Sequence, residues 1–259
     1  MTATANKDWN PGAYAKFRGL RLRPALDLMA QVGTLPPGPV VDLGCGDGAA
    51  AAALRAAFPE RALIGIDNSP AMLKAAQGYD ALHLADIAAW QPETPPALIF
   101  SNAALQWLPD HARLMPHLAG MLPKGGVLAV QMPGQTQAPS HRLLRDTAAA
   151  LFPERFGDLP ERQAVAKPED YWRLLSPLGN VLAWETTYVQ QLGPVTEGHP
   201  VRAFTESTAM RPYLERLDRP EVSAFRAAYD AALARAYPLL PDGGALLPFR
   251  RVFFVFVKE

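Results

Sequence analysis

The 259-residue sequence contains a single cysteine, Cys45, so it can form neither an intramolecular disulfide nor a cysteine-ligated metal cluster. No apolar run approaches the ~18 residues of a membrane-spanning helix. The formal net charge is +0, which gives no overall attraction to nucleic acid or anionic membranes. Residues 1–10 are polar and lack the cationic-then-apolar pattern of a signal peptide. We expect a cytoplasmic protein, in the simplest case a monomer, without metal, nucleic-acid or membrane partners.

The chain does contain a clear ligand-binding pattern. Hydrophobic residues make up 49% of it, enough for a sizeable core. Residues 40–48 read as a buried strand that ends in an acid and a glycine-rich turn, and residues 49–58 read as an alanine-rich helix. A second strand over residues 62–67 ends in Asp67, which follows Gly46 by 21 positions. Together they predict half of a nucleotide-binding unit.

The details of the turn indicate which cofactor it binds. Gly44, Gly46 and Gly48 are spaced one residue too tightly for a dinucleotide fingerprint. Asp42 and Asp47 would repel a diphosphate, which favours the positive end of a helix. The turn therefore suits a cofactor with cationic groups and no phosphate. S-adenosyl-L-methionine fits, with S-adenosyl-L-homocysteine as the product, and the pattern resembles the first two motifs of the Rossmann-like methyltransferases.

Strands and helices alternate through the first half of the chain. Further strands are predicted at residues 81–86, 97–102, 126–132, 181–190 and 251–257. Helices are predicted at residues 70–78, 114–122, 141–152 and 169–176, after an N-terminal helical segment broken at Pro24. This order predicts an α/β fold with a mostly parallel sheet and helices on both faces. The carboxyl ends of parallel strands would then bring Asp42, Asp67, Asp86 and Asn102 to one edge.

We predict four segments within this fold. Residues 1–30 form an N-terminal cap, and residues 31–200 form the Rossmann-like core. Residues 201–240 form a helical insertion that covers the substrate, and residues 241–259 return a strand to the core sheet. The second half is less regular than the first, and the insertion is placed between the strands predicted at residues 181–190 and 251–257.

Several motifs make a family resemblance specific. They are Asp8–Pro11, Arg21–Ala25, Asp42–Gly48, Gly65–Asp67, Ser69–Leu73, Ala85–Ile87, Trp90–Pro92, Ser101–His111, Gly125–Pro133 and Arg211–Leu214. With them the chain resembles the trans-aconitate 2-methyltransferase family from about Trp9 to its C-terminus. The runs Gln106–His111 and Arg211–Tyr213 are the most selective. Asp47 departs from the family, which usually has proline there.

The resemblance implies roles for the residues of the cofactor motifs. Gly44 and Gly46 would meet the methionine part, Asp42 its ammonium group, and Asp67 the ribose hydroxyls. Asp86 and Ile87 would hold the adenine, and Asn102 would lie near the reacting centre. The predicted cofactor-binding residues are Asp42, Gly44, Cys45, Gly46, Asp67, Asn68, Met72, Asp86, Ile87 and Asn102.

The resemblance also implies methyl transfer to a carboxylate oxygen of a small polycarboxylate. A carboxylate is ionised at neutral pH, so no catalytic base is expected, and His111 is interpreted as a helix-start or packing residue. Arginine matches carboxylates by paired hydrogen bonds. The predicted substrate-binding residues are Tyr14, Arg23, Trp107, Arg211 and Tyr213.

Three other functions remain open at this stage. The acceptor could be a hydroxyl or amine of another small molecule, which would require a base. The chain could instead be a non-catalytic module that binds the cofactor. A nicotinamide dehydrogenase fits least, because of the glycine spacing.

Overall fold

The computed structural model describes residues 18–157, 165–206 and 208–259. Contacts divide the chain into two compact units. Of the described residues, 18–133, 165–186 and 251–259 belong to the first, called here the sheet unit, and 134–157, 187–206 and 208–250 belong to the second, called here the helical unit. In the described residues, no helix has both the length and the hydropathy needed to span a membrane.

Strands and helices alternate along the sheet unit. Its strands are β1 (Val40–Leu43), β2 (Leu63–Asp67), β3 (Ala81–Leu84), β4 (Leu98–Asn102), β5 (Val127–Pro133), and most of β6 (Gly179–Leu192) and β7 (Ala245–Lys258). Its helices are α2 (Arg18–Met29), α3 (Ala51–Ala57), α4 (Pro70–Ala75), α5 (His111–Gly120) and α8 (Pro168–Leu175), with short 3-10 turns η1 (Leu105–Trp107) and η2 (Ser176–Leu178).

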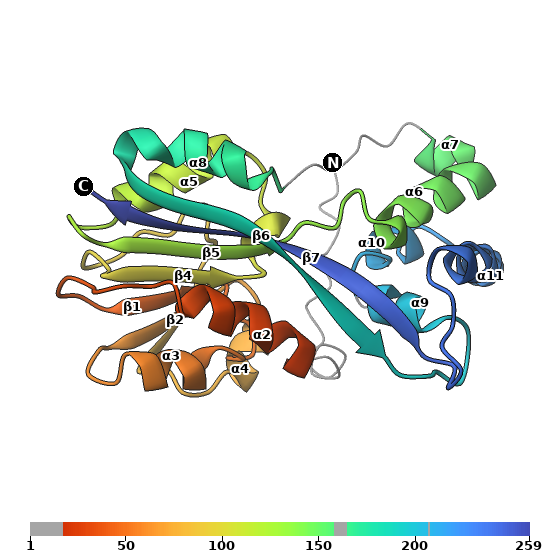
Figure 1. Cartoon of the computed structure of the whole chain (residues 1–259), viewed down its shortest axis with the longest axis horizontal. Helices are drawn as coiled ribbons and strands as arrows, with labels where there is room; N and C mark the ends of the chain where they lie inside the picture. Colours follow the sequence, from red (N-terminus) through yellow and green to blue (C-terminus); the bar gives the residue numbers. More distant parts are fainter. Residues whose placement is uncertain (1–17, 158–164, 207) are drawn as a thin grey trace. The chain divides into compact units, whose positions relative to one another are not determined.

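The seven strands form one sheet in the order β3-β2-β1-β4-β5-β7-β6 (Figure 1). Neighbours from β3 to β5 are parallel, whereas β7 runs antiparallel to β5. This confirms the predicted α/β fold with a mostly parallel sheet. The carboxyl ends of β1, β2, β4 and β5 therefore lie along one edge. Arg251, in the middle of β7, lies at the same edge because it pairs with Pro133.

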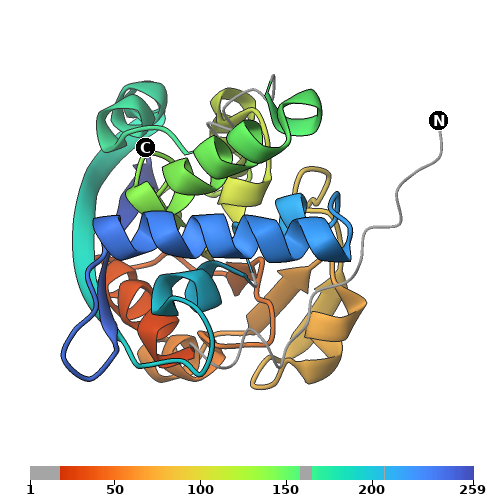
Figure 2. The same cartoon turned by 90° about the vertical axis from the view of Figure 1, so that its right-hand side faces the viewer.

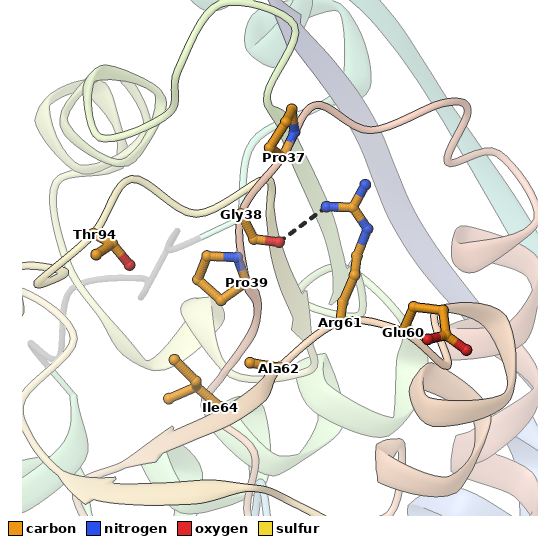
Figure 3. A pocket seen from close by; sticks show the side chains of 8 residues that line it. All are labelled: Pro37, Gly38, Pro39, Glu60, Arg61, Ala62, Ile64 and Thr94. Carbon is orange, nitrogen blue, oxygen red and sulfur yellow. Dashed lines mark hydrogen bonds between the residues drawn. The ribbon is translucent and has the colours of Figure 1, made fainter.

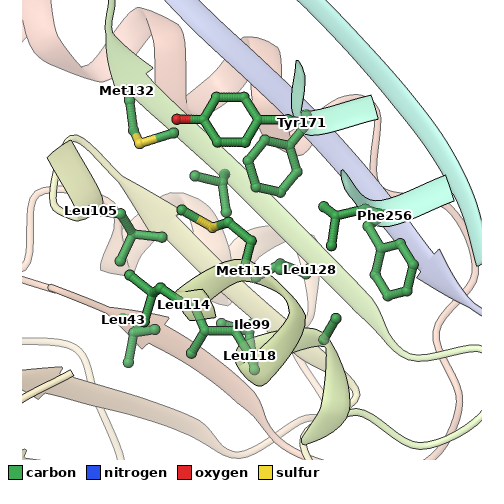
Figure 4. Packing of buried hydrophobic residues seen from close by; sticks show 14 of the residues in the cluster. Leu43, Ile99, Leu105, Leu114, Met115, Leu118, Leu128, Met132, Tyr171 and Phe256 are labelled. Carbon is green, nitrogen blue, oxygen red and sulfur yellow. The ribbon is translucent and has the colours of Figure 1, made fainter. Parts of the chain in front are cut away.

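One face of the sheet packs against α5 and α8. Leu114, Met115 and Leu118 of α5 are almost fully buried against residues such as Ile99 and Leu128 of the sheet (Figure 4). Burying a large aliphatic side chain contributes roughly 1.5–3 kcal/mol. Helix α5 begins at His111, three residues before the predicted start.

The opposite face packs against α2. This helix runs through Pro24, so the predicted break there is wrong. Proline inside a helix costs about 3 kcal/mol, because it removes a backbone hydrogen bond and crowds the preceding turn. Ala25 and Leu28, however, are fully buried, and α2 contacts β5. Burial on the sheet offsets the cost of the proline, a tertiary effect that local sequence does not reveal.

The amino ends of the strands carry an open cavity of about 530 Å³ (Figure 3). Pro39 and Ala62, which precede β1 and β2, line it together with Arg61. The Arg61 guanidinium donates to the carbonyls of Leu35, Pro36 and Gly38 at 2.7–3.0 Å. These bonds hold the turn before β1. The cavity lies at the edge opposite the predicted site, and Arg61 is interpreted as a structural clamp.

The helical unit contains α6 (Pro139–Leu151), α7 (Pro153–Phe156), α9 (Pro200–Glu206), α10 (Arg211–Leu214) and α11 (Arg219–Ala236). Asp218 is the N-cap residue of helix α11, and its carboxylate accepts from the Glu221 amide in a capping box. Helix α11 lies alongside α6 (Figure 2), and its buried Tyr229 donates to the Ser140 carbonyl at 2.6 Å. The contacts thus group α6 and α7 with the helices of the predicted insertion. The predicted bounds of that insertion, residues 201–240, stay a prediction.

Candidate functional site

The glycine turn after β1 is closely approached by two other loops. Gly44, Gly46 and Gly48 all have positive φ, a conformation that favours glycine. A side chain at Gly44 would overlap the methyl of Ala104, and its Cβ would lie 3.5 Å from Ile87 Cδ1. The turn therefore meets the loops after β3 and β4. Three segments that the sequence analysis assigned to cofactor binding lie together here.

Asp67 fixes the turn from the end of β2. Its Oδ2 accepts a hydrogen bond from the Gly46 amide at 2.8 Å, and its Oδ1 accepts one from the Ser69 amide at 2.9 Å. Each carboxylate oxygen keeps a further lone pair for a ligand. The predicted contact of Asp67 with ribose hydroxyls stays a prediction, and the structure adds a role in holding the glycine turn.

Asp42 is buried beneath the turn and has a partner that the sequence analysis missed. Tyr79 Oη donates to Asp42 Oδ2 at 2.6 Å. Burial is the main cause that raises the pKa of Asp42 to about 7; the Tyr79 hydrogen bond opposes this shift, and the charge of Asp67 adds to it. A cation bound near Asp42 would favour its ionised form.

Cys45 lies in the same turn with a buried thiol. Burial raises its pKa, and the negative charges of Asp42 and Asp67 raise it further. The thiol therefore stays protonated and is not a nucleophile. The Cys45 amide donates to the Ile66 carbonyl at 3.0 Å, so the position helps to tie the turn to β2.

The remaining predicted cofactor residues surround these turns. Asn68 is exposed directly after β2, and Met72 is buried in α4. Asp86 is exposed after β3, and its Oδ1 accepts from the Ala88 amide at 2.9 Å, which shapes the loop that carries Ile87. The sheet thus brings Asp86, Asp67 and Asp42 to neighbouring strand ends, in that order.

Buried amide atoms without partners lie at the end of β4, in the following turn η1 and in β5. Among the described residues, Asn102 Oδ1, Gln106 Oε1 and Gln131 Nε2 make no hydrogen bond. Asn102 and Gln131 are register partners in adjacent strands. Ala103, which follows Asn102, has a φ of 56°, unusual for a residue with a Cβ. Unsatisfied buried polar atoms and local strain are typical of a site that a polar ligand completes.

Gln131 and Arg251 were not identified from the sequence. Gln131 is fully buried and Arg251 is 3% exposed. An Arg251 nitrogen, Nη1, lies 3.5 Å from Gln131 Oε1. Local sequence gives little signal for either residue: Gln131 lies in an apolar strand, and Arg251 follows another arginine. Only the register between β5 and β7 brings them together.

The predicted substrate residues fall in both units. Arg23 is largely exposed on α2 and pairs with Asp27, and Trp107 in η1 is 38% exposed. In the helical unit, Arg211 pairs with Glu215 at 2.9 Å, and Tyr213 packs against the ring of Phe156. Tyr14 lies outside the described residues. Their assembly around one substrate stays a prediction.

His111 is confirmed as a helix-start and packing residue. It is the first residue of α5, and its ring is buried. Nε2 lies 2.9 Å from the Leu105 carbonyl and must donate to it, so Nδ1 accepts from Tyr171 Oη at 2.7 Å. Burial lowers its pKa. Both ring nitrogens are occupied and the ring is neutral, so His111 cannot serve as a base.

Comparison with known proteins identifies the family. A profile described as a methyltransferase domain matches residues 14–167. A Methylobacterium nodulans protein named trans-aconitate 2-methyltransferase is 45% identical over 255 residues, which cover 96% of this chain and 97% of that protein. The chain belongs to the trans-aconitate 2-methyltransferase family. Another member, from Klebsiella pneumoniae, is 43% identical over 96% of this chain and 97% of its own length.

Solved structures support the fold of this trans-aconitate 2-methyltransferase family member. Phosphoethanolamine N-methyltransferase 2 of Haemonchus contortus, in complex with S-adenosyl-L-methionine, aligns with a TM-score of 0.55 at 17% identity, covering 96% of this chain and 56% of that one. The YcgJ protein of Bacillus subtilis aligns with a TM-score of 0.56 at 11% identity, covering 92% and 99%. The sheet unit therefore has the Rossmann-like methyltransferase fold.

Proposed function

We propose that the protein transfers a methyl group from S-adenosyl-L-methionine to a carboxylate oxygen of trans-aconitate or a similar small polycarboxylate. The products are the monomethyl ester and S-adenosyl-L-homocysteine. The observation that carries the proposal is the full-length similarity to relatives named for this activity. The chemistry of the site supports it.

The residues at the sheet edge fit the cofactor. When bound, S-adenosyl-L-methionine supplies an electrophilic methyl group on a positively charged sulfur. Asp42 and Asp67 place two carboxyl groups around a turn in which Gly46 leaves open space for a close ligand, and Asn102 offers a buried acceptor without a partner among the described residues. The residues proposed to hold it are Asp42, Gly44, Cys45, Gly46, Asp67, Asn68, Met72, Asp86, Ile87 and Asn102.

No residue of the chain needs to remove a proton in this reaction. A carboxylate acceptor has a pKa of about 4 and is already nucleophilic at neutral pH. The neutral, doubly hydrogen-bonded ring of His111 agrees with this, since its nitrogens are committed to packing. Rate enhancement then comes from proximity and orientation, because the site holds the acceptor oxygen in line with the methyl group and the sulfur.

The acceptor requires positive charge and hydrogen-bond donors. A guanidinium binds a carboxylate through two parallel bonds, so we propose Arg23 and Arg211 as contacts for the acid. Tyr14, Trp107 and Tyr213 would add walls or donors. In this proposal, residues 1–30 and 201–240 form the cap over the acid, and residues 31–200 with 241–259 form the core.

The direct test uses labelled methyl donor and a panel of di- and tricarboxylic acids. We expect label in a monomethyl ester of trans-aconitate, identified by mass spectrometry, and weaker transfer to acids with fewer carboxylates. A reaction without protein is the control. Calorimetry that detects donor binding, together with no transfer to any acid, would instead favour a non-catalytic cofactor-binding module.

The pH dependence of turnover separates carboxylate acceptors from hydroxyl or amine acceptors. At saturating donor and acid, we expect kcat to stay level from about pH 6 to 9, because the acceptor is ionised throughout. A base-dependent enzyme would lose about tenfold in kcat per pH unit below the pKa of its base. A sloping kcat over this range would therefore contradict carboxylate transfer.

A further inference from the structure

Charge changes sign along the carboxyl edge of the sheet. In strand order, the edge carries Asp67 on β2 and Asp42 on β1, then the amides of Asn102 on β4 and Gln131 on β5, and finally Arg251 on β7. The acidic end suits a cation, and the basic end suits an anion. A cationic donor and an anionic acceptor would meet at the amides between them.

Arg251 fixes the orientation of the Gln131 side chain. Its Nη1 lies 3.5 Å from Gln131 Oε1, and a guanidinium can only donate hydrogen bonds. The amide oxygen of Gln131 must therefore face Arg251, which leaves Nε2 pointing away from it. Gln131 is fully buried, and Nε2 has no hydrogen-bond partner among the described residues. A buried donor without an acceptor is costly unless a ligand supplies one.

We propose that Gln131 Nε2 donates a hydrogen bond to a carboxylate of the acceptor acid, and that Arg251 is the positioning residue that orients this amide. The inference deepens the proposed function and rests on it. It adds a subsite on β5 and β7, within the sheet unit, to the contacts proposed for Arg23 and Arg211. The buried positive charge of Arg251 also strengthens the hydrogen bond by favouring the ionised acid in a medium of low dielectric constant.

Gln131→Glu is the decisive variant. It keeps the size of the side chain and the oxygen that faces Arg251, but it replaces the donor with a second acceptor and adds negative charge. We expect the KM for trans-aconitate to rise about 10- to 100-fold, the factor that a hydrogen bond to a charged group is worth. The Kd for S-adenosyl-L-methionine should stay within about threefold, and Tm should not fall, since the introduced carboxylate would pair with Arg251.

Four further variants guard against a purely structural explanation. Gln91→Glu adds the same charge at an exposed glutamine of the same unit and should leave KM unchanged. Gln131→Met removes the donor without charge and should raise KM about tenfold. Arg251→Met should raise KM in the wild type but add little to Gln131→Met, because Arg251 acts through that amide. Arg251→Lys should restore part of the loss.

Binding of trans-aconitate in the presence of S-adenosyl-L-homocysteine separates this subsite from the proposed function. If the wild type binds the acid but transfers no methyl group, the proposed function fails, and the subsite is judged by whether Gln131→Glu weakens binding. If the wild type is active and Gln131→Glu keeps its KM, the subsite alone is overturned. A wild type that neither binds nor methylates any acid overturns both.

Discussion

Replacing Asp67 with alanine is expected to weaken S-adenosyl-L-methionine binding by at least about 100-fold. The carboxylate accepts hydrogen bonds from the amides of Gly46 and Ser69, and each bond to a charged group is worth about 1.5–3 kcal/mol. Without it, the glycine turn loses its anchor and the proposed ribose contact disappears. Isothermal titration calorimetry of the purified variant measures the loss directly.

Asp80 provides a matched control for Asp67. Asp67 ends β2, whereas Asp80 binds the other end of that strand: its Oδ2 accepts from the amide of Leu63, the first residue of β2, at 2.7 Å. The Arg55 guanidinium lowers the pKa of Asp80. Asp80→Ala should lower Tm while leaving donor affinity intact. If both variants lose affinity in proportion to their loss of stability, Asp67 would be a structural residue only.

Asp42→Asn is expected to abolish donor binding and to stabilise the free protein at pH 8. Burial raises the pKa of Asp42 from 3.8 to about 7. The folded state therefore holds a proton at Asp42 up to about pH 7, whereas the unfolded chain releases it near pH 4, so stability falls as pH rises between these values. Asparagine removes this penalty, which is about 4 kcal/mol at 1.36 kcal/mol per pKa unit.

The same ionisation predicts how donor affinity varies with pH. Only the ionised carboxylate attracts an ammonium group, so the Kd of the wild type should be level above about pH 7 and rise up to about tenfold per unit below it. Tyr79→Phe removes the hydrogen bond that opposes the shift, so the transition should move to higher pH. A Kd that is constant from pH 5 to 8 would contradict the proposed role of Asp42.

Features set by short stretches of sequence were predictable. The glycines of the first turn and the acids at the strand ends follow from local periodicity, since a strand, a turn and a helix each leave a readable pattern. The terminal strand over residues 251–257 was also predicted, but its place beside β5 and its antiparallel direction were not. Pairing between strands so distant in sequence leaves no local signal.

Contacts between distant residues were the part that sequence could not supply. Tyr79 and Asp42 are 37 positions apart, and Arg251 and Gln131 are 120 apart. Each partner taken alone looks like an ordinary loop or strand residue. Helix α2 is a similar case. It continues through Pro24, although proline usually breaks a helix, because Ala25 and Leu28 are buried.

By itself, the sequence determined the family, the α/β order of elements and the acidic glycine turn, because these are properties of neighbouring residues. Only the tertiary structure decided that Asp42 is buried with a pKa near 7, that Asp67 anchors the turn, and that the Gln131 amide lies beside the buried guanidinium of Arg251. The physical reason is that burial, hydrogen-bond partners and charge order depend on which strands become neighbours, and the folded sheet sets those neighbours.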